Sequence, residues 1–272
     1  MRCPLCTILG VSALLAIPAF LIAATPMQKA PAPAAVPAAA AVPAAAAGEK
    51  EWKVHDRDRP QPAMVTAGNH GGAPSDATTL FDGKDMSQWT GGDNQVKWAV
   101  KDGIVQITPG SGDIRTKDSF GSCQLHIEWM VPETCQCKDQ HGCNSGVFFM
   151  DQYELQILGS NPNKTYVDGM AGAMYGQYPP LVNPCRPNGQ WNTYDVVFHA
   201  PIFAKDGTVT KVGTMTVLFN GILVQDHSEI WGSTAHGAKA HYTAHADKLP
   251  IHIQDHGDAL CFRNIWIRPL AN

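Results

Sequence analysis

The stretch Met215-Thr-Val-Leu-Phe-Asn-Gly-Ile-Leu-Val224 indicates how most of this chain folds. Two short runs of strand-forming residues flank Asn220-Gly221, a dipeptide that readily adopts the positive φ angles of a two-residue hairpin turn. Asp102-Gly103 stands in the same relation to the runs at 98–100 and 104–107. The sequence therefore predicts two antiparallel β-hairpins.

Further runs with a period of two residues continue on both sides of these hairpins, and no amphipathic helix separates them. Strands joined by turns, without the spacing of βαβ units, favour two packed antiparallel sheets. We therefore expect one all-β domain from Thr79 to Leu270, built as a sandwich or jelly roll. The additional expected strands are 124–131, 145–150, 153–158, 193–199, 251–254 and 261–267.

The segment before this domain has the composition of an export signal followed by a linker. Residues 1–25 carry Arg2, then an apolar run from Ile8 to Ala24 that ends in small residues, which is typical of a secretory signal peptide. Residues 26–78 are first rich in Ala and Pro and then polar, which is typical of a disordered or loosely docked linker. We expect an exported protein, periplasmic or extracellular, with a retained N-terminal anchor as the alternative to cleavage.

The charge balance excludes two classes of partner. The formal net charge is -4 and 16% of the residues are charged. The chain therefore offers no basic field for nucleic acid and no polybasic patch for anionic lipid. We expect a small neutral partner and no nucleic acid, and the sequence indicates no particular protein partner.

The spacing of the cysteines allows two interpretations. Those outside the expected signal segment are Cys123, Cys135, Cys137, Cys143, Cys185 and Cys261. In an exported protein, a disulfide should form within the 135–143 loop or join that loop to Cys185. A zinc knuckle is the alternative, but structural zinc sites normally use a two-residue spacer, so the disulfide is favoured. Cys123 and Cys261 lie in strand patterns, where buried thiols or a cross-strand bridge are both compatible.

Three expected strands alternate polar with apolar residues. On 153–158, Glu154 and Gln156 share one face, whereas Tyr153, Leu155 and Ile157 share the other. The same alternation occurs twice more and involves Gln124, His126 and Glu128, and then His252, Gln254 and His256. These rows are either the wet side of a sandwich or the lining of a binding site.

Short motifs in a fixed order identify the family that the chain resembles. They are Leu80-Phe-Asp-Gly-Lys-Asp-Met-Ser-Gln-Trp89, Gly110-Ser-Gly-Asp-Ile114, Asn144-Ser-Gly-Val-Phe148, Tyr153-Glu-Leu-Gln156, Gly176-Gln-Tyr-Pro-Pro180, Trp191-Asn-Thr-Tyr-Asp195, Asn220-Gly221, Gln254-Asp-His-Gly257 and Phe262-Arg-Asn-Ile-Trp-Ile-Arg268. With these motifs the chain resembles the 3-keto-disaccharide hydrolase family. The resemblance implies a concanavalin A-like jelly roll and substrates that are glycosides oxidised to a ketone at sugar carbon 3. The 135–143 loop departs from the family pattern, which is poor in cysteine there.

The resemblance also bears on the chemistry. Laminarinase-like relatives of this fold carry Glu-x-Asp-x-x-Glu on one strand, where this chain reads Glu154-x-Gln156-x-x-Gly159 and lacks two of the three acids. An ordinary glycosidase needs two carboxyl groups across the scissile bond. A ketone at carbon 3 acidifies the hydrogen on carbon 2, so that one base and one oxyanion stabiliser can suffice for elimination of the aglycone, followed by addition of water.

We expect the catalytic site to be assembled from several strands. Glu154 or His256 would remove the proton from carbon 2, and Arg263, Gln156 or a bound divalent cation would stabilise the enolate oxygen. These side chains should converge on one pocket, where burial would raise and Arg263 would lower the pKa of Glu154. The expected substrate-binding residues are Gln156, Asn144, Tyr175, Gln254, Asn264, His126 and Glu128.

The sequence assigns no metal ligands. A divalent cation stays an alternative cofactor, with the histidines from His199 to His256 as its donors, although those at 236–245 are expected in a surface loop. Two other functions use the same fold: a non-catalytic carbohydrate-binding module and a conventional glucan glycosidase. A lectin more often offers aromatic platforms than an acid, a base and a cation, and the glycosidase would require the missing carboxylates. The leading expectation is therefore an exported hydrolase of 3-keto-glycosides.

Overall fold

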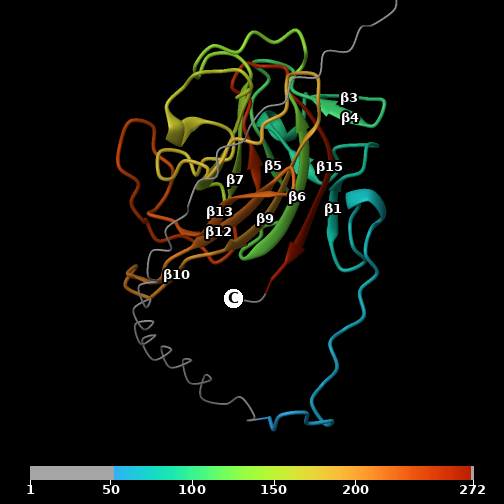
Figure 1. The fold of residues 1–272 in the computed structure, drawn as a ribbon, viewed down its shortest axis with the longest axis vertical. Helices are drawn as coiled ribbons and strands as arrows, with labels where there is room; N and C mark the ends of the chain where they lie inside the picture. The colour runs from blue at the N-terminus through green and yellow to red at the C-terminus, as the bar shows by residue number, and fades with distance from the viewer. Residues whose placement is uncertain (1–51, 271–272) are drawn as a thin grey trace, which may run out of the picture. The chain divides into compact units, whose positions relative to one another are not determined.

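The computed structural model describes residues 52–270, which Figure 1 draws in colour. The expected signal peptide at 1–25 and the part of the expected linker at 26–51 lie outside the described residues. Pro62–Asn272 forms one compact unit, and Met1–Gln61 belongs to another. Within residues 52–270, no helix is long and apolar enough to cross a membrane.

The larger of two antiparallel sheets forms one layer of the domain. Its strands follow the order β13 (Ile222–Glu229), β12 (Thr214–Phe219), β9 (Asn192–His199), β6 (Cys123–Met130), β15 (Cys261–Pro269), β4 (Ile104–Gln106) and β3 (Ala99–Lys101), and β1 (Thr78–Phe81) also pairs with β15. Figure 1 shows the long strands β6, β9 and β15 running side by side. They provide the broad surface on which the other layer packs.

The smaller sheet forms the second layer. Its order is β2 (Trp89–Thr90), β5 (Ile114–Thr116), β14 (His252–Ile253), β7 (Asn144–Phe149) and β8 (Tyr153–Leu158). A separate hairpin consists of β10 (Ile202–Phe203) and β11 (Val209–Lys211), and three short 3-10 helices are η1 (Asn69–Gly71), η2 (Gly92–Asn94) and η3 (Val167–Gly169). The expected all-β sandwich of two antiparallel sheets is confirmed. The strand expected at 251–254 is shorter, because only His252 and Ile253 pair with both neighbours.

The two sheets meet through the apolar faces of their strands. Leu155 and Ile157 of β8 are fully buried, and the ring of Tyr153 packs against Phe198 of β9 at a centroid distance of 5.9 Å. Across the layers, the Tyr194 hydroxyl donates a 2.7 Å hydrogen bond to the carbonyl of Gln156. Burial of such side chains contributes about 1.5–3 kcal/mol each, so the core determines which face of β8 turns inward.

The hairpin turns have the expected backbone. Asn220 and Gly221 have φ angles of 52° and 78°, and Asp102 and Gly103 have the same values. Both turns therefore have positive φ at both central residues, as a two-residue turn between twisted strands requires. The two hairpins predicted from these dipeptides are confirmed as the pairs β12–β13 and β3–β4.

The end of the expected linker belongs to the folded unit. The domain was expected to begin at Thr79, whereas the compact unit begins at Pro62. The carbonyl of Gly71 accepts hydrogen bonds from Asn264 and Trp266, and Asp76 pairs with Arg268 at 2.5 Å. Residues 62–78 were assigned to a linker because they lack periodicity, but side chains of β15 bind the Gly71 carbonyl and the Asp76 carboxylate.

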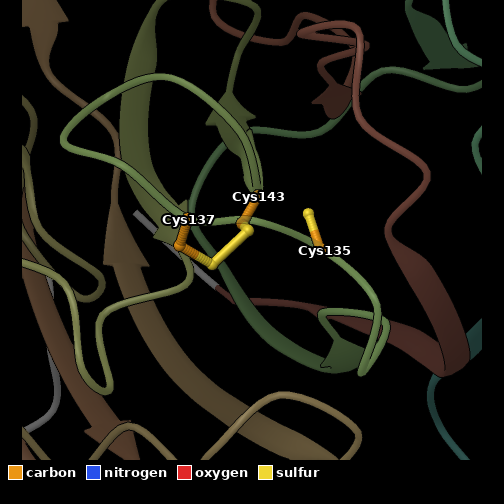
Figure 2. A group of neighbouring side chains, drawn as sticks. All are labelled: Cys135, Cys137 and Cys143. Atoms are coloured by element: carbon orange, nitrogen blue, oxygen red, sulfur yellow. A yellow bond between two sulfur atoms is a disulfide. The ribbon is translucent and has the colours of Figure 1, made fainter.

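A disulfide closes the loop before β7. Cys137 and Cys143 are bonded, and Figure 2 shows the side chain of Cys135 beside this bridge. The expected bridge within the 135–143 loop is thus present. Cys185 is a free, buried thiol, as are Cys123 and Cys261, so neither the alternative bridge to Cys185 nor the cross-strand bridge forms. The loop that departs from the family pattern is therefore held at its two ends.

This pairing predicts a specific peptide map. Trypsin cleaves after Lys138, between the bonded cysteines, so a non-reduced digest should contain two peptides joined by Cys137–Cys143 that separate on reduction. Mass spectrometry of the intact chain, digested after its thiols are alkylated under denaturing conditions, provides the measurement. Cys135 lies in the same tryptic peptide as Cys137, so fragmentation of that peptide should place the alkyl group on Cys135. An alkyl group on Cys137 instead, or a cross-linked peptide that contains Cys185, would contradict the assignment.

The contribution of the Cys137–Cys143 disulfide to stability is also measurable. By restricting the unfolded chain, so short a disulfide loop raises the free energy of unfolding by about 2 kcal/mol. Removal of the bridge should therefore lower the unfolding midpoint of a domain of this size by about 4–8 °C. The double variant Cys137→Ser/Cys143→Ser should show that loss in thermal unfolding under oxidising conditions. Under reducing conditions the wild-type midpoint should fall to that of the variant.

Candidate active site

A cavity of about 630 Å³ opens on the outer face of the smaller sheet. Its floor comes from β7 and β8, and loops that follow β6, β8, β13 and β14 form the walls. The volume lies within the range of about 300–1,000 Å³ that is usual for small-molecule sites. The lining residues are Asp139, Gln140, His141, Asn144, Phe148, Glu154, Gln156, Tyr166, Tyr175, Thr234, His236, Gln254 and His256.

Glu154 provides a buried carboxyl group in this cavity. It lies opposite Phe148 in the β7–β8 register, and only 7% of the residue is exposed. A Cβ atom at Gly146 would collide with its carboxyl group, so that glycine provides the space. Burial disfavours the charged form and raises the pKa of Glu154 from 4.5 to about 8. A carboxyl group with such a pKa can exchange a proton near neutral pH.

Hydrogen bonds to the backbone hold Glu154 in place. Its N–H donates to the Thr234 hydroxyl at 2.9 Å, and its carbonyl accepts from the N–H of Tyr175 at 3.2 Å. Its carboxyl group, by contrast, makes no hydrogen bond to another side chain in the part of the chain that the structure describes. The main chain is therefore fixed while the reactive atoms stay available to a ligand.

Three amide side chains form a network beside Glu154. The Gln156 amide nitrogen donates to Gln140 Oε1 at 3.1 Å and approaches Asn144 Oδ1 at 3.4 Å, and Asn144 donates to the carbonyl of Gln140 at 3.0 Å. Gln156 Oε1 is buried and has no partner among the described residues. Because an unpaired buried acceptor is costly, this atom indicates where a ligand hydroxyl would donate.

The disulfide loop contributes one wall of the cavity. Lys138 and His141 exchange two backbone hydrogen bonds of 2.9 Å. The Asp139 carboxylate accepts from Thr165, and Gln140 donates to the same hydroxyl and to the carbonyl of Gly169. The bridge and these bonds hold Gln140 where it meets Gln156. The 135–143 loop, for which the sequence allowed either a disulfide or a metal site, thus forms part of the cavity wall.

The opposite wall is aromatic. The hydroxyl groups of Tyr166 and Tyr175 lie 2.6 Å apart, and the Tyr175 hydroxyl lies 3.0 Å from His236 Nδ1. Tyr175 was expected to bind substrate and lines the cavity. His236 lies in the stretch that was expected to be a surface loop; its ring is exposed and still faces the cavity.

Six of the ten expected site residues meet here. Glu154, Gln156, Asn144, Tyr175, Gln254 and His256 all line the cavity. His256 is exposed at its edge, and the N–H of Gln254 donates to the carbonyl of Gly146 at 3.0 Å. Residues that come after β14 therefore reach the floor of the site because β14 pairs directly with β7.

Arg263 does not join them, which corrects the expectation of an acid and a cation in one pocket. It lies on β15 in the larger sheet and donates to Glu128 at 2.6 Å. Its guanidinium group also lies 4.1 Å from the centroid of the Trp191 ring. No arginine among residues 52–270 therefore lowers the pKa of Glu154, and the effect of burial prevails.

Glu128, His126 and Asn264 belong to the same outer face of the larger sheet. Asn264 donates to Glu128 at 2.8 Å and lies 3.1 Å from His126 Nε2, and His126 Nδ1 lies 2.7 Å from Asp195. Asn264 also donates to the carbonyl of Gly71, so these residues fasten the N-terminal segment. His126 and Glu128 were expected to contact substrate because strand alternation places them on a polar face, and Asn264 because it lies in a family motif. Neither signal indicates to which sheet the residue belongs.

Several lining residues were not anticipated. They are Asp139, Gln140, Phe148, Tyr166 and Thr234, together with His141 and His236. A closed 137–143 loop directly before Asn144 was a usable signal for Asp139 to His141. Nothing local in the sequence marks Thr234, which arrives from a distant loop to bind the backbone of Glu154.

The clustered group of potential metal ligands in the described part of the chain lies outside this cavity. Among the described residues, the one group of three such side chains is Cys135, Cys137 and Cys143, whose sulfur atoms all lie within 4.8 Å of one another. With Cys137 and Cys143 bonded, Cys135 alone remains as a thiol, and burial together with Asp258 raises its pKa. His199 lies near His227 at a ring distance of 6.5 Å and does not line the cavity.

Comparisons with known proteins agree with this fold. A 3-keto-disaccharide hydrolase from Bacteroides thetaiotaomicron is 24% identical over 236 residues, which cover 71% of this chain and 78% of that protein. A crystal structure of a candidate glycosyl hydrolase from Parabacteroides distasonis is 40% identical, covers 84% of this chain and all of that one, and superimposes with a TM-score of 0.75. A second candidate glycosyl hydrolase from that organism shares the fold at 20% identity and a TM-score of 0.52. These relatives confirm the expectation of a hydrolase.

The family match covers nearly the whole domain. Residues 76–268 match the family described as 3-keto-alpha-glucoside-1,2-lyase-like domains. The resemblance drawn from the sequence motifs is therefore confirmed, and the match begins close to the Asp76–Arg268 ion pair. This chain belongs to the family of 3-keto-alpha-glucoside-1,2-lyase-like domains.

Proposed function

We propose that the protein hydrolyses 3-keto-glycosides, including 3-keto-disaccharides, outside the cytoplasm. The observation that carries this proposal is one buried carboxyl group, that of Glu154, whose pKa is raised to about 8 and which faces a cavity beside an unpaired amide oxygen. Such a group suits proton transfer to and from carbon near neutral pH. The family membership and the printed name of the Bacteroides relative support the substrate class.

The proposed reaction begins with proton abstraction. The Glu154 carboxylate takes the proton from carbon 2, and the electron pair of that C–H bond moves into an enolate whose negative charge lies on the oxygen of carbon 3. As the carbonyl re-forms, the bond between carbon 1 and the aglycone oxygen breaks, and the aglycone leaves as an alcohol with the proton that Glu154 had taken up. Water then adds its hydroxyl group to carbon 1 and its other proton to carbon 2, so the net reaction is hydrolysis and Glu154 is again a carboxylate.

The amide network replaces Arg263 as the proposed enolate stabiliser. The amide groups of Gln156, Asn144 and Gln140 bond to one another beside Glu154, and rearrangement on substrate binding could direct one N–H toward the oxygen of carbon 3. A preorganised donor in a water-poor site is worth about 2.7–4 kcal/mol of barrier in other enzymes. His256 and His236 border the cavity and are available to the leaving oxygen. The proposal assigns no step to a metal.

Export fits the remaining observations. The expected signal segment at 1–25 would direct export of the chain from the cytoplasm. The disulfide in the wall of the site is compatible with an oxidising compartment. The neutral character expected of the substrate agrees with the uncharged amides and tyrosines that make up half of the polar lining.

The proposal is tested by comparing a disaccharide with its 3-keto derivative, each with and without a chelator. We expect the purified protein to release the leaving sugar from the keto compound alone, at a rate that the chelator does not change. Cleavage of the unoxidised disaccharide would favour a conventional glycosidase. Binding without cleavage of either compound would favour a lectin-like module, and loss of activity with chelator would assign a step to a cation.

Replacing Glu154 should separate chemistry from folding. Glu154→Gln keeps the shape and removes the base, so kcat on a 3-keto-disaccharide should fall by about 10²- to 10⁴-fold. Glu128→Gln is the matched control, because it makes the same change at a carboxylate that binds Arg263 on the other sheet. That control should retain kcat. Unchanged turnover in a folded Glu154→Gln variant would move the base role to His256.

The raised pKa of Glu154 predicts opposite pH trends for rate and stability. The base form is a minority at pH 7 and becomes the majority above about pH 8, so kcat/KM should rise with pH and level off there. Between the unfolded pKa of 4.5 and the folded pKa of about 8, the folded protein holds a proton that the unfolded chain has released. The free energy of unfolding therefore falls as pH rises through this interval.

Denaturant unfolding of the wild type and of Glu154→Gln at both ends of the interval isolates this effect. From below pH 4.5 to above pH 8, the free energy of unfolding of the wild type should fall by up to about 5 kcal/mol more than that of the variant, since the pKa rises from 4.5 to about 8 on folding and one pKa unit corresponds to about 1.4 kcal/mol. Parallel curves for the two proteins would show that Glu154 titrates as an ordinary solvent-exposed carboxyl group.

A further inference from the structure

A second cavity lies beside the first. Its volume is about 520 Å³, and it shares three lining residues with the candidate active site, namely Tyr166, Tyr175 and His236. Glu154 lines the first cavity only. The two spaces are thus neighbouring halves of one longer recess, with the proposed base confined to one half.

The three shared residues form the partition between the halves. Tyr166 and Tyr175 are joined through their hydroxyl groups at 2.6 Å, and Tyr175 continues to His236 Nδ1 at 3.0 Å. The rings of Tyr175 and His236 are stacked, with centroids 6.4 Å apart. Because these groups are bonded in a row, they mark one position along the recess that any ligand filling both halves has to pass.

The second half contains an exposed aromatic side chain that is held in a fixed orientation. Trp231 is 41% exposed, although an indole ring normally avoids water. Its ring N–H donates to the Tyr178 hydroxyl at 2.6 Å, and the Tyr178 ring packs edge-on against it at 4.9 Å. Its backbone N–H donates to Gln177 Oε1 at 2.7 Å. The polar edge of the ring is satisfied, so the rest of the exposed ring is available as an apolar platform.

Such a platform matches the chemistry of a sugar ring. One face of a pyranose carries mainly C–H groups, which pack favourably against the electron-rich face of an aromatic ring. Asp168 and Lys239 also line this half and offer an acceptor and donors for the hydroxyl groups at the edge of such a ring. An apolar surface with a few polar groups at its border is the usual composition of a specific small-molecule site.

We propose that the second cavity binds the leaving group of the substrate, a second sugar ring stacked on Trp231, while the keto sugar occupies the cavity of Glu154. This inference rests on the proposed function and assigns the scissile bond to the partition of Tyr166, Tyr175 and His236. It follows that the enzyme selects glycosides whose aglycone is a sugar or another ring with an apolar face.

The test compares two substrates that differ in the leaving group alone: a 3-keto-disaccharide and the methyl glycoside of the same 3-keto sugar. For Trp231→Ala, we expect kcat/KM on the disaccharide to fall by about 3- to 30-fold, mainly through KM, and kcat/KM on the methyl glycoside to stay within about twofold of the wild type. Trp231→Phe keeps an aromatic face and should restore most of the loss. Ile222→Ala, at a comparably exposed apolar residue that lines neither cavity, should leave kcat/KM unchanged on both substrates.

Two outcomes distinguish failure of this inference from failure of the proposed function. If the wild type cleaves both keto substrates and Trp231→Ala affects them equally or not at all, the leaving-group site is wrong and the hydrolase proposal stands. If the wild type cleaves neither substrate, the proposed function fails. As an independent readout, the free leaving sugar should compete with the disaccharide for the wild type, with an inhibition constant about 3- to 30-fold weaker for Trp231→Ala.

Discussion

The alternation of side chains along β8 is the constraint on which the site depends. Tyr153, Leu155 and Ile157 are buried against the larger sheet, and a strand that buries one face turns its other residues away from it. Glu154 and Gln156 therefore face the cavity. A shift of this strand by one residue would expose its apolar side chains, so the free energy of core burial also fixes the direction of the proposed base.

The outward face of β8 is nonetheless withdrawn from water. Loops from residues 138–141 and 234–236 cover it, and the disulfide and the Thr234 hydrogen bond hold those loops in place. Burying a carboxyl group without a partner costs stability, and the raised pKa of Glu154 is the measure of that cost. The fold thus tolerates an unpaired buried carboxyl group where proton transfer requires one. The disulfide and the hydrogen bonds of the 137–143 loop limit the loop opening that would expose this group to water.

The opposite face of the sandwich uses similar residues for a different purpose. Around His126, the carboxylates of Glu128 and Asp195 have close polar partners, including Arg263 and Asn264, and together with Trp266 the cluster fastens the backbone near Gly71. Hydrogen bonds and the arginine outweigh burial and lower the pKa of Glu128. The contrast between Glu128 and Glu154 shows that partners decide whether a carboxyl group in this fold stabilises structure or stays available for chemistry.

The sequence by itself determined the strands, the two hairpin turns and which residues of each strand share a face, because these depend on short-range periodicity and on turn dipeptides with positive φ angles. It determined the family through short motifs in a fixed order. It also identified six residues that line the cavity. Only the tertiary structure decided to which sheet each polar face belongs, and it therefore separated Arg263, His126, Glu128 and Asn264 from Glu154. Alternation predicts which side chains of a strand point toward the core and which point away from it, but it carries no information about the neighbours of that strand. Pairing between distant segments, such as β14 with β7 and residue 234 with Glu154, arises from packing of the whole chain.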